Sequence, residues 1–593
     1  MLTLEGCNGR QPGIELRSEC VLGYRSQAER RSEVSRTPVA GLTTPEHRCL
    51  RRRKGGIQAQ GRGWTPSIWE MSAEGDPLMS TRRSAARCRI VFACVAILSG
   101  AAEACPPHTK CEVAIVGGGA AGMHTFYRLA PILGHKVCLF EKNGYFGGRI
   151  RDIRSPNGTG KFAAGAFRVM QTQTVLFNLA IELGIELEPA DYVESRVFAR
   201  GVFRSDTNDF AGPGNPYPSV GPPDFPDYSC VGPHNHPGCF ADALFHRLFS
   251  NSGPPPGKDQ AIEDYALNLM DSEHFQFLKD TSRFRADFST NVDARSFVDW
   301  AREESAVCCL PYYPVGGMSA FIIGMLQAAR ANGARAFSSE PIKSINKRGR
   351  RYILRTPRRL VTAKNVVIAV PPGGLRHITG SIARRIRTQP QFKAIKPIKV
   401  VTIGNWWDAA WWGTIDRAWA TPESDFKFNF IEFPHSTYQK EQLATRSVYD
   451  DDPRTIKLWV RAYKAGGKDA VNSMIVSQLS EFFPDADILE SQITKTHFQE
   501  WRNGWHWLKK GVDFSNADIA IWARNPLIDE RVSLVGEAYN PNRSSWSDAA
   551  YKSSINTLNH NFGLGLPCAS VVADGGGLKY VPFDDPNYHC PAL

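Results

Sequence analysis

The chain has 593 residues, which is too many for one compact domain, so at least two domains are expected. Hydrophobic residues make up 42% of the chain, which predicts a globular protein with a sizeable core. The formal charge is +12, but residues 1–104 hold 16 Lys and Arg against 10 Asp and Glu, so the remainder is only mildly basic and no nucleic-acid partner is expected.

The first 104 residues are expected to be leader sequence. Residues 1–78 lack hydrophobic periodicity and are rich in Arg, Ser, Gly and Thr, which indicates a disordered leader or a mis-assigned start. Residues 79–104 combine arginines, the apolar run 90–98 and an Ala-x-Ala site before Cys105, which predicts a secretory signal peptide. The run is short for a transmembrane helix, so secretion without a stable membrane anchor is expected, with a signal anchor as the alternative.

A glycine turn organises the first part of the mature chain. The apolar run at residues 113–116 is followed by small residues with G-x-G-x-x-G spacing, namely Gly117, Gly119, Ala120, Ala121 and Gly122. Such residues let backbone N–H groups and a helix N-terminus approach a pyrophosphate. The next apolar strand ends in Glu141, 19 residues after Gly122, the distance expected for a carboxylate that binds ribose hydroxyls. A dinucleotide-binding βαβ unit is predicted, and a βαβ unit without a nucleotide is the alternative.

The segment that follows Glu141 contains Lys142, a glycine pair ending in Gly148, and Arg149. It resembles the flavin-dependent amine oxidases, in which this extension holds the pyrophosphate and ribose side of FAD. Nicotinamide enzymes do not need it, and an arginine beside a diphosphate is physically reasonable.

A second resemblance concerns substrate choice. The stretch Gly165, Ala166, Phe167 and Arg168 is similar to the Gly-x-Met-Arg stretch of the L-amino-acid oxidases, and these residues are also assigned to the cofactor side of the site. The resemblance implies that Arg168 binds the substrate α-carboxylate, which simple amines lack. The alternative is a structural salt bridge.

The middle of the chain gives weaker matches. Residues 240–305 show helical spacing, which fits the helical insertion of L-amino-acid oxidases. The resemblance places Ile342 near the adenine. It also places Lys399, with Lys396 as the fallback, at the start of a substrate-domain strand, where a lysine helps O2 to accept electrons. The alternative is an exposed lysine beside an edge strand.

The C-terminal part contains a strand that ends in Gly536 and Glu537, followed by a helix that opens at Trp546, Ser547, Asp548 and Ala549. This pattern resembles the C-terminal flavin motif of L-amino-acid oxidases. The resemblance implies that Glu537 binds the ribityl chain, that the helix N-terminus faces the flavin pyrimidine carbonyls, and that Trp546 walls the substrate cavity. Trp505 or Trp507 is expected to face Trp546. A buried helix without a ligand is the alternative.

Beyond residue 104 there are nine cysteines, and none forms a C-x-x-C pair with metal-site spacing, so disulfides are expected and no metal is. Cys230 and Cys239 flank a loop that a disulfide would close. Cys138 lies in a buried strand and is predicted to be a free core thiol.

The fold class expected from the resemblance is α/β, with a discontinuous Rossmann-like FAD-binding domain, an α+β substrate domain and a helical insertion. The expected boundaries are 105–170, 306–395 and 516–565 for the FAD-binding domain, 171–210 and 396–515 for the substrate domain, 211–305 for the helical insertion, and 566–593 for a C-terminal tail.

The implied function is that of a secreted FAD-dependent L-amino-acid oxidase. Hydride transfer from Cα to the flavin would give an imino acid that hydrolyses to a 2-oxo acid and ammonia, and O2 would be reduced to hydrogen peroxide. The expected partners are a small-molecule L-amino acid and O2, and a homodimer is compatible with the sequence. The alternatives are a monoamine or polyamine oxidase of the same fold, and a catalytically inactive secreted protein that keeps the FAD fold.

Overall fold

The computed structural model describes residues 107–155, 161–170, 173–189, 197–204, 207–220, 244–249, 254–282, 284–288, 291–305, 311–414, 423–424, 427, 429–433, 443–540, 546–567, 571–574 and 577–580. All of them belong to one compact unit, Ser99–Leu593. The expected leader, the signal peptide and the Cys230–Cys239 pair lie outside the described residues and stay predictions.

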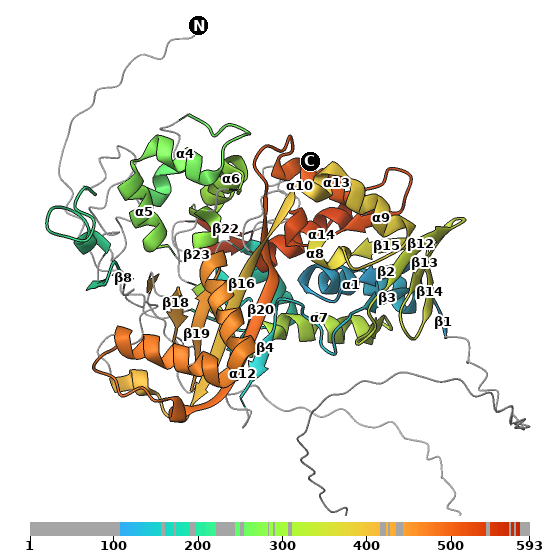
Figure 1. The fold of residues 1–593 in the computed structure, drawn as a ribbon. Helices are drawn as coiled ribbons and strands as arrows, with labels where there is room; N and C mark the ends of the chain where they lie inside the picture. Colours follow the sequence, from blue (N-terminus) through green and yellow to red (C-terminus); the bar gives the residue numbers. More distant parts are fainter. Residues whose placement is uncertain are drawn as a thin grey trace, which may run out of the picture. The chain divides into compact units, whose positions relative to one another are not determined.

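A five-stranded parallel sheet in the order β11-β3-β2-β15-β21 forms the first main layer of the fold (Figure 1). Its strands are β11 (Arg335–Phe337), β3 (Val137–Phe140), β2 (Val113–Val116), β15 (Asn365–Ile368) and β21 (Val532–Leu534). Every residue of β2 and β3 is buried, as expected for strands that are covered on both faces. The sheet therefore joins three widely separated parts of the sequence.

Alternation along β2 divides the surrounding core in two. Val113 and Ile115 pack into one hydrophobic cluster, whereas Ala114 and Val116 pack into another, because successive strand residues point to opposite faces. The first cluster contains the helices α1 (Ala120–Leu133), α2 (Thr174–Leu183), α7 (Ser319–Ala331) and α14 (Trp546–Phe562).

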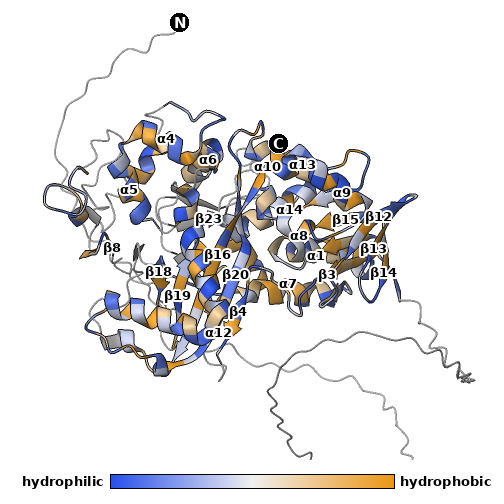
Figure 2. Cartoon of the chain, viewed as in Figure 1, coloured by the Kyte–Doolittle hydropathy of each residue, from blue (hydrophilic) through white to orange (hydrophobic). Residues whose placement is uncertain are grey.

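The second cluster lies under a smaller sheet and three helices. The sheet has the order β1-β14-β13-β12, with β1 (His108–Lys110), β14 (Leu360–Ala363), β13 (Arg351–Arg355) and β12 (Ser344–Arg348). The helices are α9 (Ser381–Thr388), α10 (Pro390–Ala394) and α13 (Asn516–Arg524). Figure 2 shows the apolar residues concentrated on the parallel strands and on α7.

A seven-stranded sheet in the order β20-β16-β19-β18-β17-β8-β9 forms the other main layer. The long strands β16 (Ile395–Trp407) and β20 (Ile493–Leu508) pair antiparallel, and β19 (Ala444–Asp450) pairs with β16. The remaining strands are β18 (Phe430–Glu432), β17 (Glu423–Ser424), β8 (Val197–Ala199) and β9 (Val202–Arg204). Helix α12 (Pro453–Phe482) packs on this sheet and is interrupted by non-helical backbone at Gly466 and Gly467.

The remaining elements are short. Helices α4 (Ile262–Leu269), α5 (Ser272–Asp280) and α6 (Ala294–Ser305) lie in the segment predicted to be a helical insertion. β4 (Asp152–Arg154) pairs with β5 (Lys161–Ala163), and β22 (Val571–Asp574) pairs with β23 (Gly577–Tyr580). A three-stranded sheet has β10 (Pro311–Pro314) between β6 (Val169–Met170) and β7 (Leu187–Pro189). The last helix is α8 (Pro372–Leu375).

Cys111 and Cys138 form a disulfide, so the prediction of a free thiol at Cys138 is wrong. The reason is the register of two neighbouring strands. Val113 lies opposite Val137 in the parallel pair of β2 and β3, which brings the residues just before β2 close to the start of β3. The Cα atoms of the two cysteines are 6.0 Å apart, a normal separation for a disulfide.

Replacing both cysteines with alanine is expected to lower the free energy of unfolding by about 3 kcal/mol, because the bridge restricts the unfolded chain between residues that are 27 apart in sequence. Denaturant unfolding of wild type and of the double variant measures this loss. Unfolding the wild type in a reductant is the control and should give a similar loss. A wild-type midpoint that a reductant leaves unchanged would contradict the disulfide.

Candidate functional site

The glycine turn after β2 is packed so tightly that two of its positions accept only glycine. Gly117 has φ +106°, in the region that L side chains rarely adopt. A Cβ on Gly122 would lie 2.0 Å from the Gly117 carbonyl oxygen. The first turn of α1, where Ala120 and Ala121 stand, carries no acidic residue, so the positive end of the helix dipole is not neutralised locally. The turn therefore fits a dinucleotide pyrophosphate.

Glu141 lies against this turn at the end of β3. One carboxylate oxygen accepts the Gly118 N–H at 2.8 Å, and the other accepts the Asn143 N–H at 2.8 Å. Burial raises the pKa of Glu141, and these two backbone hydrogen bonds oppose the rise. The Glu141 carbonyl accepts the Glu340 N–H at 2.8 Å, which brings the buried Ile342 to the same end of the sheet. Lys142, by contrast, is exposed.

The second glycine pair docks on the first turn. The Gly147 N–H donates to the Gly118 carbonyl at 2.8 Å, and Gly148 has φ +59°. This close approach of two backbone segments directs Arg149, the next residue, toward the C-terminal part of the chain.

Arg149 reaches Glu537, 388 residues away. Its Nη1 donates to Glu537 Oε2 at 3.0 Å and to the Gly504 carbonyl at 2.6 Å. His506 completes the cluster, since its backbone N–H donates to Glu537 Oε1 at 3.0 Å and its Nδ1 lies 2.8 Å from Oε2. Burial alone would raise the pKa of Glu537, but the His506 and Arg149 charges and hydrogen bonds outweigh burial and lower the pKa to about 2. The two predicted halves of the FAD site thus meet at one buried carboxylate, three residues after the end of β21 and next to Gly536.

The aromatic wall forms from Trp505 and Trp546. Their ring centroids are 4.9 Å apart with an interplanar angle of 61°, and Phe284 lies 5.8 Å from Trp546. Trp507 points elsewhere and packs on Trp300, with centroids 5.4 Å apart. The geometry selects Trp505 as the aromatic residue that faces Trp546. Trp546 has φ +51°, a strained conformation for a residue other than glycine.

Behind this wall lies a buried carboxyl group that the sequence did not reveal. The indole N–H groups of Trp505 and Trp507 both donate to Asp287 Oδ1, at 3.1 and 2.8 Å. Burial raises the pKa of Asp287 to about 7, against the opposing effect of the two indole hydrogen bonds and the Lys396 charge.

Asp287→Asn is expected to stabilise the protein at pH 8 to 9 and to have little effect below about pH 4. The folded pKa of about 7 exceeds the ordinary pKa of 3.8, so stability falls as pH rises between these values, by up to about 4 kcal/mol. An amide oxygen still accepts both indole hydrogen bonds but loses no proton. Thermal unfolding of both proteins across this pH range measures the effect, and equal slopes for the two would contradict it.

Arg168 and a second arginine, Arg446, both lie against the Phe167 ring. The loop that begins at Gly165 docks on Arg149, because a Cβ on Gly165 would lie 1.8 Å from the Arg149 carbonyl oxygen and the Ala166 N–H donates to that same oxygen at 3.1 Å. The guanidinium carbons of Arg168 and Arg446 lie 5.0 and 4.0 Å from the centre of the Phe167 ring.

Arg446 is buried, and its Nη1 has no hydrogen-bond partner within the described residues. Its Nε lies 3.3 Å from Glu432 Oε2, and its Nη2 donates to the Ala163 carbonyl at 2.9 Å. Burial raises the pKa of Tyr449, and the charges of Arg446 and Arg168 oppose that rise, so both arginines act on the same tyrosine. These residues form a positively charged corner beside Phe167.

Strand alternation separates the two candidate lysines. Lys396 pairs with Trp507 in the strand register and is half-buried. Its charge interacts with that of Asp287, and burial lowers the pKa of Lys396. Lys399 is exposed and lies on the opposite face of β16, which it shares with Pro397. Pro397 pairs with His506, whose side chain binds Glu537. Ile398 and Val400 pack in the cluster of Trp505 and Trp507, so Lys399 between them points away from the buried aspartate and toward the Glu537 face, at the point where the register of β16 and β20 shifts, whereas Lys396 lies on the face of the aspartate.

The start of α14 is buried at Ser547, Asp548 and Ala549. Asp548 Oδ1 accepts the Leu176 N–H at 3.1 Å, and Oδ2 lies 2.9 Å from Lys552 Nζ. The Asp548 side chain therefore connects α14 to α2, and a flavin contact from this turn would come from the helix N-terminus itself.

Three functional candidates were missed by the sequence prediction, namely His506, Asp287 and Arg446. A signal for His506 exists in the run Trp505-His506-Trp507, because a period of two places the histidine on the face opposite to both tryptophans. Asp287 and Arg446 carry no local pattern.

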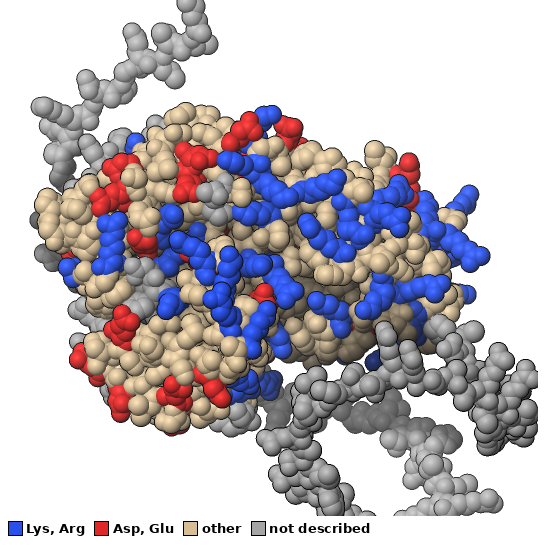
Figure 3. All heavy atoms as spheres, in the orientation of Figure 1, with Lys and Arg blue, Asp and Glu red and all other residues tan. Residues whose placement is uncertain are grey.

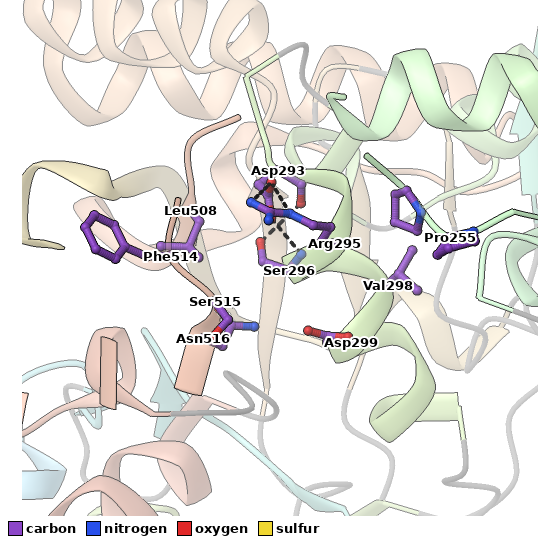
Figure 4. A pocket seen from close by; sticks show the side chains of 11 residues that line it. Pro255, Asp293, Arg295, Ser296, Val298, Asp299, Leu508, Phe514, Ser515 and Asn516 are labelled. Atoms are coloured by element: carbon purple, nitrogen blue, oxygen red, sulfur yellow. Dashed lines mark hydrogen bonds and ion pairs between the residues drawn. The ribbon is translucent and has the colours of Figure 1, made fainter. Parts of the chain in front are cut away.

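A separate cavity of about 280 Å³ lies between α6 and the start of α13 (Figure 4). It is lined by Pro255, Pro256, Asp293, Arg295, Ser296, Val298, Asp299, Leu508, Phe514, Ser515 and Asn516, none of which was predicted as a site residue. Within the described part of the chain, no cluster of three His, Cys, Asp or Glu could hold a metal ion. Among those same residues, no helix combines the length and apolar character needed to cross a membrane.

Comparison with known proteins gives a consistent result. The family model described as flavin containing amine oxidoreductase matches residues 132–557. A solved structure of a putrescine oxidase double mutant has a TM-score of 0.57 and 15% identity, covering 77% of this chain and all 100% of that one. Wild-type putrescine oxidase bound to putrescine has a TM-score of 0.56, 14% identity and the same coverage. At such identities the likeness shows the fold alone.

A curated cinnamate reductase from Clostridium sporogenes is 64% identical over 39 residues. This segment amounts to 7% of this chain and 6% of that protein, so the two share only a local stretch.

Proposed function

The chain belongs to the flavin-containing amine oxidoreductase family, and from that premise we propose that it is a secreted FAD-dependent L-amino-acid oxidase. The family and the fold neighbours confirm the predicted α/β class with a Rossmann-like FAD domain, FAD as the cofactor, and an oxidoreductase acting on small molecules. The finer substrate class and the secretion are the proposal.

The positively charged corner around Phe167 carries the substrate assignment. Arg168 and Arg446 both lie against this ring, and Arg446 keeps a buried donor without a partner in the described residues. A substrate carboxylate would satisfy this Arg446 donor, whereas an amine cation would meet two guanidinium groups against the single Glu432 carboxylate and would be repelled. The corner therefore favours an amino acid over a monoamine, diamine or polyamine.

The other residues supply positioning and orientation. The glycine turn, Glu141, Arg149 and Glu537 would hold FAD, and the N-terminus of α14 would face the pyrimidine carbonyls. When bound, FAD supplies the acceptor for the hydride from the substrate Cα and passes electrons to O2. Trp546 and Trp505 would pack against the substrate side chain while the arginines fix its carboxylate, and these two restraints together orient the Cα hydrogen.

The lysine beside the flavin is proposed to be Lys399, because it shares the Glu537 face of β16. Lys399→Met is expected to slow reoxidation of the reduced enzyme by O2 by about tenfold or more, because the positive charge favours electron transfer to O2. Lys396→Met, on the opposite face, is the matched control and should reoxidise normally. Stopped-flow oxidation of the anaerobically reduced proteins measures both rates. The reverse order would transfer the role to Lys396.

Secretion is supported by the Cys111–Cys138 disulfide, since stable disulfides form mainly in oxidising compartments. Sequencing the N-terminus of protein recovered from the medium tests it, and a terminus near Cys105 is expected. Residues 1–78 on secreted protein would contradict the leader prediction.

The direct test of the function is a substrate panel. Purified holoenzyme should release peroxide, ammonia and a 2-oxo acid from L-amino acids, and should be much slower with D-amino acids and with amines such as putrescine. Faster turnover of amines would assign an amine oxidase instead. A yellow, folded protein that oxidises neither class would assign an inactive FAD-fold binding protein.

A further inference from the structure

Positive charge is segregated on one part of the chain. Residues 341–407 hold 16 Lys and Arg and no Asp or Glu. The other residues from 105 onward hold 39 Lys and Arg against 49 Asp and Glu, so that remainder is acidic. A mildly basic average therefore conceals two regions of opposite charge.

The fold collects many of these cations on one surface. The cations that the hairpin of β12 and β13 and the adjacent helix α9 expose include Lys347, Arg348, Arg350, Arg351, Arg384 and Arg385, which we call the basic surface. In Figure 3, blue side chains gather over the region where Figure 1 places β12, β13 and α9.

Hairpin and helix are joined rigidly. The Ser381 N–H, at the start of α9, donates to Asn346 Oδ1 on β12 at 2.9 Å. Gly380 has φ +100°, and a Cβ there would lie 2.2 Å from the Ile345 carbonyl oxygen, so only glycine allows this approach. The backbone positions that carry the six cations therefore keep a fixed spacing, which limits the backbone entropy lost on binding a partner.

Neutralisation within the protein is incomplete. Glu530 contacts Lys347 Nζ at 2.9 Å and Arg385 Nη1 at 2.6 Å, so one carboxylate is shared by two cations. Within the described part of the chain, no carboxylate forms an ion pair with Arg348, Arg350 or Arg351. The tip of the hairpin thus presents three arginines to solvent.

The surroundings limit the partner class. None of the large hydrophobic side chains exposed among the described residues lies in 341–407, so nothing there can insert into a lipid bilayer. The aromatic residues of this stretch, Tyr352, Phe392, Trp406 and Trp407, are buried and cannot stack on bases. The basic surface therefore recognises its partner through anionic groups alone, and the planar guanidinium group is suited to bind them.

We propose that the basic surface binds a linear sulfated polysaccharide. The choice of this polyanion over duplex nucleic acid rests on the proposed secretion, which the Cys111–Cys138 disulfide supports because disulfides are typical of oxidising compartments. Binding is electrostatic, weakens with salt, and uses a surface separate from Arg168 and Trp546, so bound chains need not block the substrate site.

The test uses heparin as the probe and the FAD-loaded protein. A triple variant, Arg348→Glu, Arg350→Glu and Arg351→Glu, is compared with Lys457→Glu, Arg461→Glu and Lys464→Glu, three exposed cations of α12. The two variants change net charge equally. Heparin affinity at about 0.15 M salt should fall at least about tenfold in the first variant and less than about twofold in the second. The salt dependence of binding should also become shallower only in the first.

Several outcomes overturn the proposal. Equal weakening in both variants would show a net-charge effect without a site, and wild type that fails to bind heparin would remove the premise. Tighter binding of a duplex DNA oligonucleotide than of heparin at equal salt would assign nucleic acid, and binding only to anionic phosphatidylserine vesicles would assign a membrane. If the Glu variant fails to fold, the same three positions changed to Gln give the comparison. Heparin binding is read without turnover, so failure of the oxidase assignment leaves this result interpretable.

Discussion

Arg168→Ala is expected to lower kcat/KM for an L-amino acid by tens to thousands of fold, equivalent to about 2 to 5 kcal/mol of transition-state stabilisation. The reason is the positively charged corner around Phe167. Removing one guanidinium leaves the substrate carboxylate with Arg446 alone and allows the substrate to rotate. Steady-state peroxide release measures the loss.

The comparison that decides the role uses the decarboxylated amine of the same amino acid. Wild type should prefer the amino acid, and Arg168→Ala should lose activity on it while losing little on the amine. Arg168→Lys should recover only part of the activity, because a point charge does not reproduce the bidentate fork. Flavin absorbance should stay unchanged. An equal loss on both substrates would mean that Arg168 is structural and would remove the support for an amino-acid substrate.

The part of the site that could be predicted from the sequence is the part with local signals. A glycine turn between an apolar strand and a helix must be tight, and Gly117 and Gly122 are indeed fixed by backbone contacts. Glu141 follows a strand at the distance set by one βαβ unit, so its place beside the turn follows from chain geometry.

Contacts that depend on register between distant segments could not be predicted. The Cys111–Cys138 bridge depends on the register between β2 and β3. The hydrogen bond between Arg149 and Glu537 depends on assembly of the whole parallel sheet. Asp287 is the clearest case. It comes from a single-turn 3-10 helix, Arg285–Phe288, between α5 and α6, and only the fold places it under two tryptophans of β20. A buried carboxyl in a polar-looking loop has no sequence signature.

Replacing Glu537 is expected to have the largest effect on cofactor binding. Glu537 accepts from Arg149, from the His506 backbone and from the His506 ring, all in a buried position. Glu537→Ala removes the carboxylate that pairs with Arg149 and leaves the buried His506 ring and backbone N–H without this acceptor, and breaking a buried pair of this kind destabilises a protein by about 3 to 5 kcal/mol. The same change removes the residue proposed to bind the ribityl chain. We expect FAD occupancy of the purified variant, measured by absorbance after denaturation, to fall to a small fraction of one per chain.

Glu537→Gln separates the two effects. An amide keeps the shape and one acceptor oxygen but carries no charge, so the folded state should survive while FAD affinity stays reduced. The pH dependence gives a second readout. The folded pKa of about 2 lies below the ordinary pKa of 4.5, so the carboxylate contributes stability above pH 4.5 that is lost as pH falls toward 2. The acid limb of thermal stability should therefore be steeper in the apo wild type than in apo Glu537→Gln. Full FAD occupancy in Glu537→Ala would show that Glu537 does not hold the cofactor. Identical acid limbs would show that it does not hold the Arg149–His506 cluster.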